Sequence, residues 1–498
     1  MTDAPTDSTF FDVVVVGAGL SGVAAAHYLQ TLCPTRSYVI LENRQATGGT
    51  WDLFRYPGVR SDSDMFTLGY SFRPWESDAS FATGPAIREY VAATAREEGI
   101  TPHIRFGHRV TGAAWDSQQA RWRVTATLTT PGEPARDVFF DCRFLFFCSG
   151  YYNYEQGHTP PWPGREDFKG RIVHPQHWPA DLDYRNRKVV VIGSGATAVT
   201  LVPDMAASAA HVTMLQRSPS YIVALPARDR VGALLRRWLP SRLSHPLIRW
   251  KNIALASAFY QFARHRPATV RRLILREAAR LLGPGFDVQR HLAPRYNPWD
   301  QRLCIAPDAD IFRAVRSGKA DIVTGQIECF TPTGLRLSSG EEIAADVIVT
   351  ATGLELKVLG GAALSVDGAA VDLSKAVVYR GAMFSGVPNL AVAFGYTNAS
   401  WTLKCELVAR YVCRLLNEME ARQLDACVPV NDDAQLPTQP FLDLSSGYVQ
   451  RSAHLLARQG LRRPWRMYQN YLLDLLALKF SPLRDGVLRF SARPAPRD

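Results

Sequence analysis

Several features that would place the chain in a familiar structural class are missing from its sequence. Its eight cysteines include no C-x-x-C pair, and eight cysteines in 498 residues fit a reducing compartment rather than a disulfide framework. No run reaches the roughly 18 uncharged apolar residues of a membrane span. The N-terminal MTDAPTDSTF is polar and acidic, unlike a signal peptide, and no solenoid-type repeat occurs. We therefore expect a cytoplasmic, globular protein.

Length and charge give further limits. A chain of 498 residues exceeds one hydrophobic core, so two or three domains are expected, and 21% charged residues is ordinary for such domains. The net charge of +11 is concentrated in residues 221–280, which hold 13 Lys and Arg but only two acids, Asp229 and Glu277. The remainder of the chain is therefore electrically balanced.

The first glycine-rich segment is FDVVVVGAGLSG, residues 11–22. Four valines predict a buried parallel strand, Gly17, Gly19 and Gly22 form G-x-G-x-x-G, and a helical pattern follows. The next predicted strand ends at Glu42, where an acid can bind ribose hydroxyls. This context favours a site for FAD or NAD over the alternative of a glycine turn without a ligand.

A second segment of the same kind is KVVVIGSGATAV, residues 188–199. Gly193, Gly195 and Ala198 give the G-x-G-x-x-A variant. The following strand leads to Arg217 and Ser218 rather than to an acid. An arginine there can pair with a 2′-phosphate, which indicates NADPH, although an ordinary surface arginine is the alternative.

Two dinucleotide motifs in one chain indicate hydride transfer between a nicotinamide and a flavin. We predict an α/β protein with two Rossmann-like dinucleotide-binding domains, one for FAD and one for NADPH, and a helical insertion in the NADPH domain. The predicted divisions are 1–152 and 351–498 for the two parts of the FAD domain, 153–350 for the NADPH domain, and about 222–292 for the insertion.

Between the two motifs lies FKGRIVHPQHWP, residues 168–179. It fits F-x-G-x-x-x-H-x-x-x-W-P, and the chain thereby resembles the type I Baeyer–Villiger flavin monooxygenases. The segments GGTWDLFRYPG, CSGYYNY, TMLQRSP, YNPWDQRLC and GYTNASWTLK resemble the ethionamide-activating subgroup, which is close to long-chain alkane-degrading monooxygenases. The resemblance runs from about residue 10 to the C-terminal RPAP. It implies a linking, conformational role for the segment, so His174 and His177 are not predicted to be catalytic.

The resemblance also implies particular site residues. The catalytic arginine matches Arg302 in NPWDQRLC, and Asp62 is its partner; an ordinary surface salt bridge is the alternative. Val110 is similar to an adenine-side FAD contact, and residues 60–62 are expected to touch both cofactors. The predicted cofactor-binding residues are Gly17, Gly19, Ser21, Gly22, Glu42, Thr50, Trp51, Asp52, Leu53, Arg60, Ser61, Asp62, Val110, Gly193, Ser194, Gly195, Ala196, Thr197, Ala198, Val199, Arg217 and Ser218.

The function implied is an NADPH- and O2-dependent FAD monooxygenase. It would insert oxygen into lipophilic ketones to give esters, and oxidise the sulfur of thioethers and thioamides. A heteroatom- or long-chain-alkane-hydroxylating flavin monooxygenase is the main alternative. A flavin-dependent nucleotide reductase is disfavoured because no C-x-x-C pair is present, and a membrane-binding protein with vestigial nucleotide folds is disfavoured by the intact motifs.

The basic segment 221–280 is predicted to form amphipathic helices, because apolar residues recur every three or four positions with arginines between them. A solvated helical cap over the active site is the simplest interpretation. Peripheral contact with an anionic membrane is a second. Nucleic-acid binding is not expected, because no known module is present. Near the C-terminus, PWRMYQNYLLDLLALKF predicts a helix that packs over the flavin domain or serves in assembly.

Overall fold

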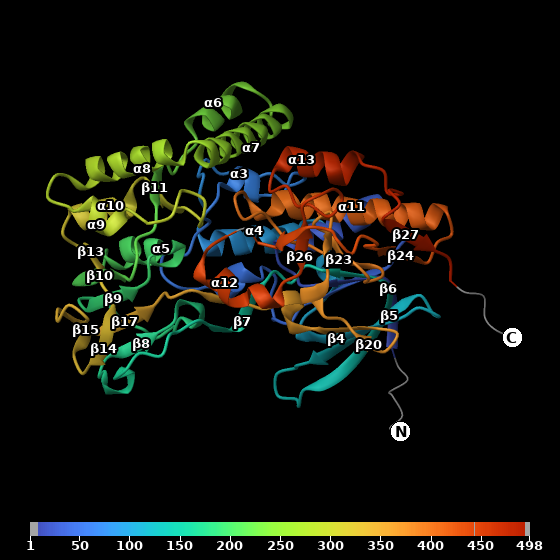
Figure 1. The fold of residues 1–498 in the computed structure, drawn as a ribbon, viewed down its shortest axis with the longest axis horizontal. Helices are drawn as coiled ribbons and strands as arrows, with labels where there is room; N and C mark the ends of the chain where they lie inside the picture. The colour runs from blue at the N-terminus through green and yellow to red at the C-terminus, as the bar shows by residue number, and fades with distance from the viewer. Residues whose placement is uncertain (1–7, 443, 494–498) are drawn as a thin grey trace.

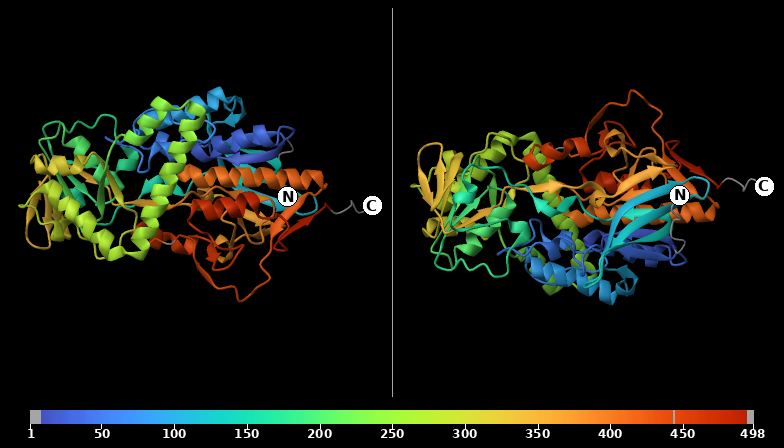
Figure 2. Two further views of the ribbon diagram at one scale, coloured as in Figure 1. Left: turned by 90° about the horizontal axis from the view of Figure 1, so that it is seen from above. Right: turned by 90° about the horizontal axis from the view of Figure 1, so that it is seen from below.

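The computed structural model describes residues 8–442 and 444–493 and has two lobes side by side (Figure 1). One lobe is built from the N-terminal and C-terminal parts of the chain, and the other from the middle. Seen from above, one long helix lies across the boundary between the lobes (Figure 2). None of the helices in the described ranges is long and apolar enough to cross a membrane.

The first lobe is organised by a nine-stranded sheet. Strand β1 (Ser8–Val16) lies at its centre because its four valines are fully or nearly fully buried. It pairs in parallel with β2 (Tyr38–Leu41) and with β6 (Arg136–Phe147). The remaining strands of this sheet are β3 (Ile104–Arg105), β4 (His108–Asp116), β5 (Arg121–Leu128), β19 (Ala363–Val366), β20 (Ala369–Ala370) and β23 (Leu390–Val392).

Helices cover one face of this sheet. Helix α1 (Leu20–Leu32) begins within the first glycine motif, directly after Gly19, and packs on α11 (Trp401–Ala421), whose apolar side chains are buried against it. Two side-chain bonds join these helices: Trp401 Nε1 donates to Ser21 Oγ at 2.9 Å, and that hydroxyl donates to Cys405 Sγ at 3.2 Å. Other helices of this lobe are α2 (Thr50–Leu53), α3 (Met65–Leu68), α4 (Gly84–Glu97) and α12 (Gly447–Ser452).

The second lobe has a five-stranded, wholly parallel sheet in the order β13-β10-β9-β17-β8. Its apolar strands are buried on both faces, as is usual for parallel sheets: helices cover one face, and the small antiparallel sheet described below covers the other. The bounds are β8 (Arg171–Val173), β9 (Lys188–Ile192), β10 (His211–Gln216), β13 (Ala320–Thr324) and β17 (Val347–Thr350), with α5 (Ala196–Met205) and α10 (Asp310–Arg316) beside them. A small antiparallel sheet of β14 (Ile327–Thr331), β15 (Gly334–Leu337) and β16 (Glu342–Ala344) extends this lobe. The predicted α/β class with two Rossmann-like sheets is confirmed.

The chain passes between the lobes twice, and the two passages pair with each other. Strand β7 (Tyr152–Gly157) runs antiparallel to β18 (Leu354–Leu356). The segment FKGRIVHPQHWP follows β7: its middle forms β8, the edge strand of the second sheet, and Pro175–His177 form a 3₁₀ turn. The segment therefore belongs to the second sheet and lies close to both passages.

The basic segment forms the predicted helical insertion, except at its start. Residues Ile222–Leu225 form strand β11, which pairs with β12 (Cys304–Pro307), so the helical part begins at Arg230. The helices are α6 (Arg230–Trp238), α7 (Ser241–His265), α8 (Pro267–Leu282) and α9 (Val288–Leu292). The C-terminal region adds α13 (Tyr471–Leu475) with one π-helical turn, η7 (Leu476–Phe480), which is placed beside α7 (Figure 1).

All eight cysteines are free, and all except Cys329 are buried. Burial raises the pKa of the Cys304, Cys405 and Cys427 thiols to about 12. These thiols are therefore protonated at neutral pH and pack as small apolar side chains.

Candidate active site

A large cavity runs from the carboxyl end of β1 towards the second lobe. It is lined by residues of the first glycine motif, of the loop after β2, of the β7 passage and of α5. Predicted site residues in the lining are Gly17, Gly19, Ser21, Glu42, Thr50, Trp51, Arg60, Asp62, Val110, Ala196, Thr197 and Arg302. The cavity thus brings together the first motif, part of the second motif and the predicted catalytic pair, which are far apart in the sequence.

The first glycine motif is closely packed. Gly17 has a φ of +102°, and a Cβ at Gly22 would lie 1.8 Å from the Gly17 carbonyl oxygen. A side chain at position 22 would therefore separate helix α1 from strand β1. This close turn points the amino end of α1 into the cavity, where its free N–H groups suit the pyrophosphate of a dinucleotide.

Glu42 lies at the end of β2, is 5% exposed and lines the cavity. Its carboxylate accepts the Ala18 N–H at 2.6 Å and the Arg44 N–H at 2.8 Å, which hold it in one orientation. Burial raises the pKa of this carboxyl, and the two N–H bonds oppose that effect. A carboxylate oxygen has further acceptor capacity, so a ribose hydroxyl that donates to Glu42 would compensate its burial.

The loop that follows supplies one wall of the cavity. Thr50 Oγ1 bonds the Tyr154 hydroxyl at 3.0 Å, which joins this loop to β7. Asp52 lies behind the wall, where its buried carboxylate forms ion pairs with Arg44 at 2.6 Å and with Arg55 at 2.9 Å. Leu53 is also buried outside the lining. Asp52 and Leu53 therefore support the loop instead of facing the cavity.

Arg302 and Asp62 meet in the cavity. Arg302 Nε lies 3.2 Å from Asp62 Oδ2, and its Nη2 donates to Asp62 Oδ1 at 3.3 Å, so the ion pair is bidentate. Burial acts to lower the pKa of Arg302, but the charge of Asp62 and the nearby Tyr151 and Tyr152 outweigh it and raise the pKa. The guanidinium is therefore cationic at every working pH.

Tyrosines surround this pair. Tyr151 and Tyr152 line the cavity beside it, with their hydroxyls 3.5 Å apart, and Tyr448 from α12 is near enough to interact with Arg302. Burial raises the pKa of all three hydroxyls. They are neutral and give the arginine partly aromatic surroundings.

The two residues that precede Asp62 lie differently. Arg60 lines the cavity, and its Nη1 forms an ion pair at 2.5 Å with Asp310 of α10, so it joins the two lobes. Ser61 is 2% exposed, and its hydroxyl accepts the Ala82 N–H at 3.2 Å. The Ser61 side chain thus forms its hydrogen bond within the first lobe and does not face the cavity.

The second glycine motif is more open. Gly193 has a φ of +142°, and a Cβ there would lie 2.2 Å from the Ala351 carbonyl oxygen. A Cβ at Gly195, by contrast, would meet no described atom within 4 Å. Ser194 Oγ donates to the Ser218 carbonyl at 3.1 Å, which fixes the loop after β10 to the motif. Ala196 and Thr197 of α5 line the cavity, whereas Ala198 and Val199 are buried in the core of the second lobe.

Arg217 and Ser218 follow β10 and are exposed on the outer side of the second motif. Arg217 forms no ion pair with any residue of 8–442 or 444–493. It is close enough to Arg451 of α12 for its charge to help lower the pKa of that arginine, after the larger effect of burial. Two arginines that repel each other here would both be stabilised by a bound dianion.

Reasoning from the sequence missed several residues of the lining. These are Tyr56, His108, Arg109, Tyr151, Tyr152, Tyr154, Lys357, Tyr396 and Trp401. Tyr151, Tyr152 and Tyr154 lie in CSGYYNY, and Tyr396 and Trp401 lie in GYTNASW, two segments that carry the family resemblance. Their aromatic clustering was a usable signal, but which rings face the cavity depends on how the two passages pair.

His174 lies at the passages between the lobes. A Cβ at Gly157, the last residue of β7, would lie 2.0 Å from its imidazole ring. Its Nδ1 accepts the Gln176 N–H at 3.2 Å, and burial lowers its pKa. His174 is thus a neutral packing residue against β7, in the position where the sequence predicts a link between the lobes.

The site suits a flavin dinucleotide and a nicotinamide dinucleotide. For the first, it offers the close glycine turn, the helix amino end and the buried Glu42 carboxylate, all in the cavity. For the second, it offers an open glycine turn and an exposed arginine on the neighbouring lobe. No group of histidines, cysteines and acids in the described part of the chain could hold a metal ion.

Comparison with known proteins agrees with this arrangement. The family model described as flavin-binding monooxygenase-like matches residues 12–252. The FAD-containing monooxygenase EthA of Mycolicibacterium smegmatis is 52% identical over 486 residues, which cover 97% of this chain and 98% of that protein.

Solved structures share the fold. An oxidized steroid monooxygenase bound to NADP matches with a TM-score of 0.70 at 24% identity, covering 85% of this chain and 88% of the other. A polycyclic ketone monooxygenase from Thermothelomyces thermophila matches with a TM-score of 0.74 at 17% identity, covering 99% and 91%. Because the family model matches and the chain is 52% identical to EthA over 97% of its length, the chain belongs to the flavin-binding monooxygenase-like family and is an FAD-containing monooxygenase.

Proposed function

We propose that this enzyme uses NADPH and O2 to insert one oxygen atom into lipophilic ketones, giving esters, and that it also oxidises the sulfur of thioethers and thioamides. The balanced reaction consumes ketone, NADPH, a proton and O2, and yields ester, NADP⁺ and water. The observation that supports this best is the Arg302–Asp62 pair in the cavity that carries the first glycine motif. FAD, when bound and reduced, supplies the electrons with which O2 is activated.

Arg302 provides a permanent positive charge at the reacting centre. Oxygen insertion into a ketone requires a nucleophilic, negatively charged oxygen, and a fixed cation in surroundings with little water stabilises such a charge strongly. Because the negative charge of Asp62 keeps the pKa of Arg302 raised, the guanidinium keeps its proton at working pH.

Asp62 positions that charge. Its two carboxylate oxygens engage Arg302 Nε and Nη2 and so fix the plane of the guanidinium, leaving Nη1 free of this contact. The carboxylate also offsets part of the positive charge, so that a reacting anion is held without being bound too tightly. Asp62 is therefore proposed as a positioning residue.

The aromatic wall supports the substrate class. Tyr151, Tyr396 and Trp401 bring large apolar surfaces into the cavity, and the Tyr151 and Trp401 rings lie 5.2 Å apart. Such a wall excludes water and favours long or bulky apolar substrates over small polar ones.

NADPH is proposed to bind at the second motif. Its pyrophosphate would lie at the open turn of Gly195, and its 2′-phosphate against Arg217 and Ser218. Arg60 and Thr197 line the cavity between the lobes and are proposed to contact both cofactors.

The first experiment measures NADPH consumption by the purified yellow holoenzyme in air with a long-chain methyl ketone and, separately, a thioamide, with products identified by mass. An ester one oxygen heavier than the ketone supports the proposal. An S-oxide, N-oxide or alcohol as the only product favours the heteroatom- or alkane-hydroxylating alternative. Hydrogen peroxide as the only product with every substrate contradicts oxygen insertion.

The variant Arg302→Ala isolates the arginine. We expect NADPH oxidation to continue, with hydrogen peroxide replacing ester and at least a roughly 100-fold loss of ester formation, because one preorganised charge contributes about that much. Arg185→Ala removes an equally charged but exposed arginine and serves as the matched control. Unchanged ester formation in Arg302→Ala would remove the proposed role.

A further inference from the structure

Helix α8 of the insertion shows how a surface helix ordinarily packs. Its apolar residues Val270, Ile274 and Leu275 are buried against the second lobe. Its charged residues Arg272 and Arg276 face solvent, as expected for an amphipathic helix on a globular protein.

Helix α7 differs, because large apolar side chains lie on its outward face as well as on its inner face, where Ile248 and Ile253 are buried. Its outward face carries a row of large apolar side chains spaced three to five residues apart. The members are Leu243, Leu247, Trp250, Leu255, Phe259 and Phe262, with exposed fractions between 37% and 60%. Between Trp250 and Phe262 the only charged side chain is Lys251, which turns inward to Asp229.

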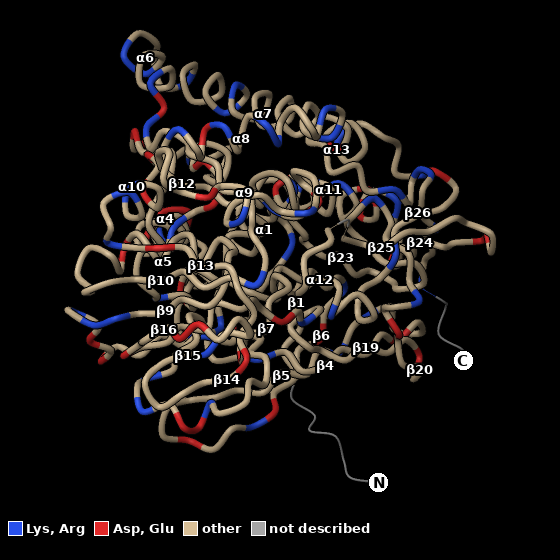
Figure 3. Tube along the Cα trace, turned by 60° about the vertical axis from the view of Figure 1, so that its left-hand side comes forward, with Lys and Arg blue, Asp and Glu red and all other residues tan. Residues whose placement is uncertain are grey.

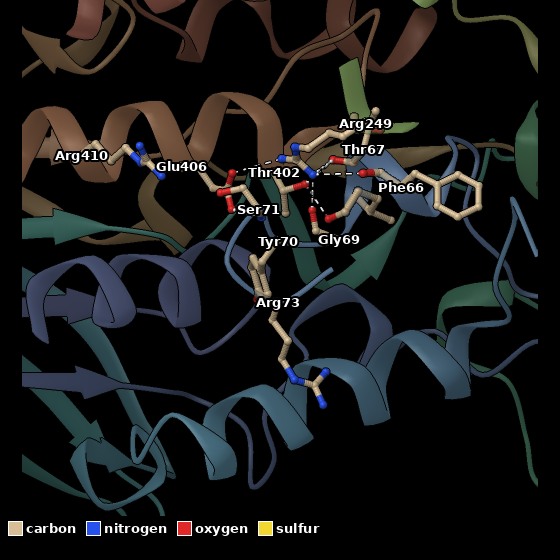
Figure 4. Close-up of polar contacts among 12 residues, drawn as sticks. Phe66, Thr67, Gly69, Tyr70, Ser71, Arg73, Arg249, Thr402, Glu406 and Arg410 are labelled. Atoms are coloured by element: carbon tan, nitrogen blue, oxygen red, sulfur yellow. Dashed lines mark hydrogen bonds and ion pairs between the residues drawn. The ribbon is translucent and has the colours of Figure 1, made fainter. Parts of the chain in front are cut away.

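The inner side of α7 also carries a buried arginine that anchors the helix. Arg249 is 11% exposed, and its Nη1 donates to the carbonyls of Phe66 at 3.1 Å and Gly69 at 2.6 Å in the first lobe (Figure 4). Its Nη2 pairs at 3.1 Å with Glu406 of α11, which is itself 7% exposed. Rotating the helix to bury its apolar stripe would leave this buried carboxylate with the Ser71 N–H but without its cation, so the outward stripe is a fixed feature.

Helix α6 repeats the pattern. Val231, Leu234 and Trp238 form one outward stripe, and Trp238 is 73% exposed. The opposite side of the helix carries Arg236, which pairs with Asp78 at 2.7 Å and donates to the carbonyls of residues 76 and 77.

The C-terminal helix continues the same surface from the other lobe. Leu472, Leu476 and Phe480 of α13 and η7 are exposed by 53% to 62%. The acid of this helix, Asp474, points inward and pairs at 2.7 Å with the buried Lys404. The rings of Trp250 and Tyr471 lie 5.6 Å apart, so α7 and α13 are neighbours, as Figure 1 also shows.

We call the outward faces of α6, α7, α13 and η7 the apolar platform. It carries 13 of the 19 exposed large apolar side chains found among the described residues, on less than a tenth of the chain. Patches of this kind on a globular protein mark an interaction site.

The charge carried by the insertion helices themselves is of one sign up to residue 276. Residues 230–276 hold 11 Lys and Arg and no acid, and the trace of α7 in Figure 3 shows basic positions but no acidic ones. Arg230, Arg237 and Arg242 are exposed and pair with no acid in the part of the chain that the structure describes. Lys479 adds a further exposed cation at the end contributed by η7.

We propose that the apolar platform docks on an anionic lipid bilayer, with its apolar side chains entering the interface and its arginines contacting lipid phosphates. Apolar side chains rimmed by cations are what such a surface binds. A second copy of the chain fits less well, because a two-fold contact would place one cationic rim against another. The sequence offers membrane contact through the basic helical insertion as one interpretation; in the structure, apolar side chains of α6 and α7 face outward, and α13 and η7 extend the same surface.

The platform lies directly over the cavity. Ile253 on the inner side of α7 packs in one buried cluster with Tyr396, which lines the cavity, and with Leu403. A lipophilic substrate that leaves the bilayer at the platform would therefore reach the site through one layer of side chains. Delivery of a substrate from the bilayer rests on the proposed function, whereas docking on the bilayer does not.

The test is sedimentation of the FAD-loaded holoenzyme with vesicles of phosphatidylcholine alone and with about 30% phosphatidylglycerol. No substrate is present, so the result is independent of catalysis. We expect binding to the anionic vesicles that is at least roughly tenfold tighter than to the neutral ones and weakens as salt is raised. Absence of binding to both kinds of vesicle would overturn the proposal.

The triple variant Trp238→Ser, Leu255→Gln, Phe480→Ser removes three exposed apolar side chains of the platform. We expect at least a tenfold loss of vesicle binding, with flavin content and turnover of a water-soluble ketone unchanged. The control is Phe10→Ser, Leu32→Gln, Leu461→Gln, which removes three exposed apolar side chains elsewhere, each 43% to 45% exposed. Equal losses in both variants would contradict a defined surface.

A second measurement separates lipid from self-association. Light scattering without vesicles gives the oligomeric state of the wild-type protein and of the triple variant. If the wild-type protein is a dimer and the triple variant is a monomer, the platform binds a second copy of the chain and not lipid. That result would overturn the proposal.

Discussion

Gly22 and Ala198 hold the same place in the two glycine motifs, yet their surroundings differ. A Cβ at Gly22 would lie 1.8 Å from a carbonyl oxygen, whereas the second motif already carries a Cβ at Ala198. Glu42, the acid of the first site, is 5% exposed and held by two N–H groups. Arg217, which takes the corresponding place in the second, is exposed and unpaired with any acid in the described ranges.

The difference matches two kinds of cofactor use. A closed, prearranged site costs little to organise on binding and releases its ligand slowly, so it suits a resident group such as FAD. An open site with exposed contacts lets a ligand enter and leave in each turnover, as NADPH must. Each of the following changes tests one side of this comparison.

The largest effect is expected from Gly22→Ala. The added methyl group cannot fit between α1 and the Gly17 carbonyl, so the turn must open and the flavin site is lost. We expect protein without yellow colour and with a clearly lower Tm, measured by flavin absorbance per protein and by calorimetry. Ala198→Gly is the control at the matching position and should keep its flavin; a fully yellow Gly22→Ala protein would show that the first turn is not closed.

Arg217→Gln should have the next largest effect. We expect kcat/KM for NADPH to fall roughly 10- to 100-fold, since a hydrogen bond to a charged group contributes about 1.5–3 kcal/mol. The value for NADH, which lacks the 2′-phosphate, should change little, and flavin content should not change. Steady-state kinetics with both nucleotides give the answer, and equal losses for the two would mean that Arg217 does not bind the phosphate.

Gly195→Ala tests the open turn. Open space surrounds the added methyl group, so folding and flavin content should be unaffected. The methyl group would nevertheless stand where the pyrophosphate of NADPH approaches, and we expect KM for NADPH to rise roughly tenfold, or about 1.4 kcal/mol. A fall in Tm as large as that of Gly22→Ala would contradict the contrast between the motifs.

The smallest effect is expected on the pH dependence of stability, through two histidines of the second lobe. Burial lowers the pKa of His174 and His291, so at pH values between their folded pKa and about 6.5 the unfolded chain binds more protons than the folded one. Stability should therefore be complete above about pH 6.5 and fall as the pH drops through the folded pKa values. His174→Gln should reduce this slope, which thermal melts at several pH values measure; a variant with the wild-type slope would exclude His174 as a source.

The sequence was informative where local patterns decide the structure. Strand–glycine–helix patterns placed both dinucleotide motifs, and Glu42 and Arg217 were found by their distance from them. The resemblance led to Arg302 and Asp62, and the structure brings these two residues together.

Other features depend on long-range contacts and could not be read in this way. The loop sequence predicts that Asp52 faces a cofactor, but arginines hold it behind the wall. The spacing of α7 gives an amphipathic helix but does not say which face is inside. The orientation of α7 is set by Glu406, more than 150 residues away, because its buried carboxylate pairs with Arg249 and holds that side of the helix inward.

The buried cysteines have a practical and a chemical consequence. An enzyme that activates oxygen releases some hydrogen peroxide, and peroxide attacks thiolates much faster than thiols. With pKa values of about 12, Cys304, Cys405 and Cys427 present almost no thiolate, so these three thiols are protected against peroxide. Cys329, the only cysteine of the chain that is not buried, is the natural place to attach a single label.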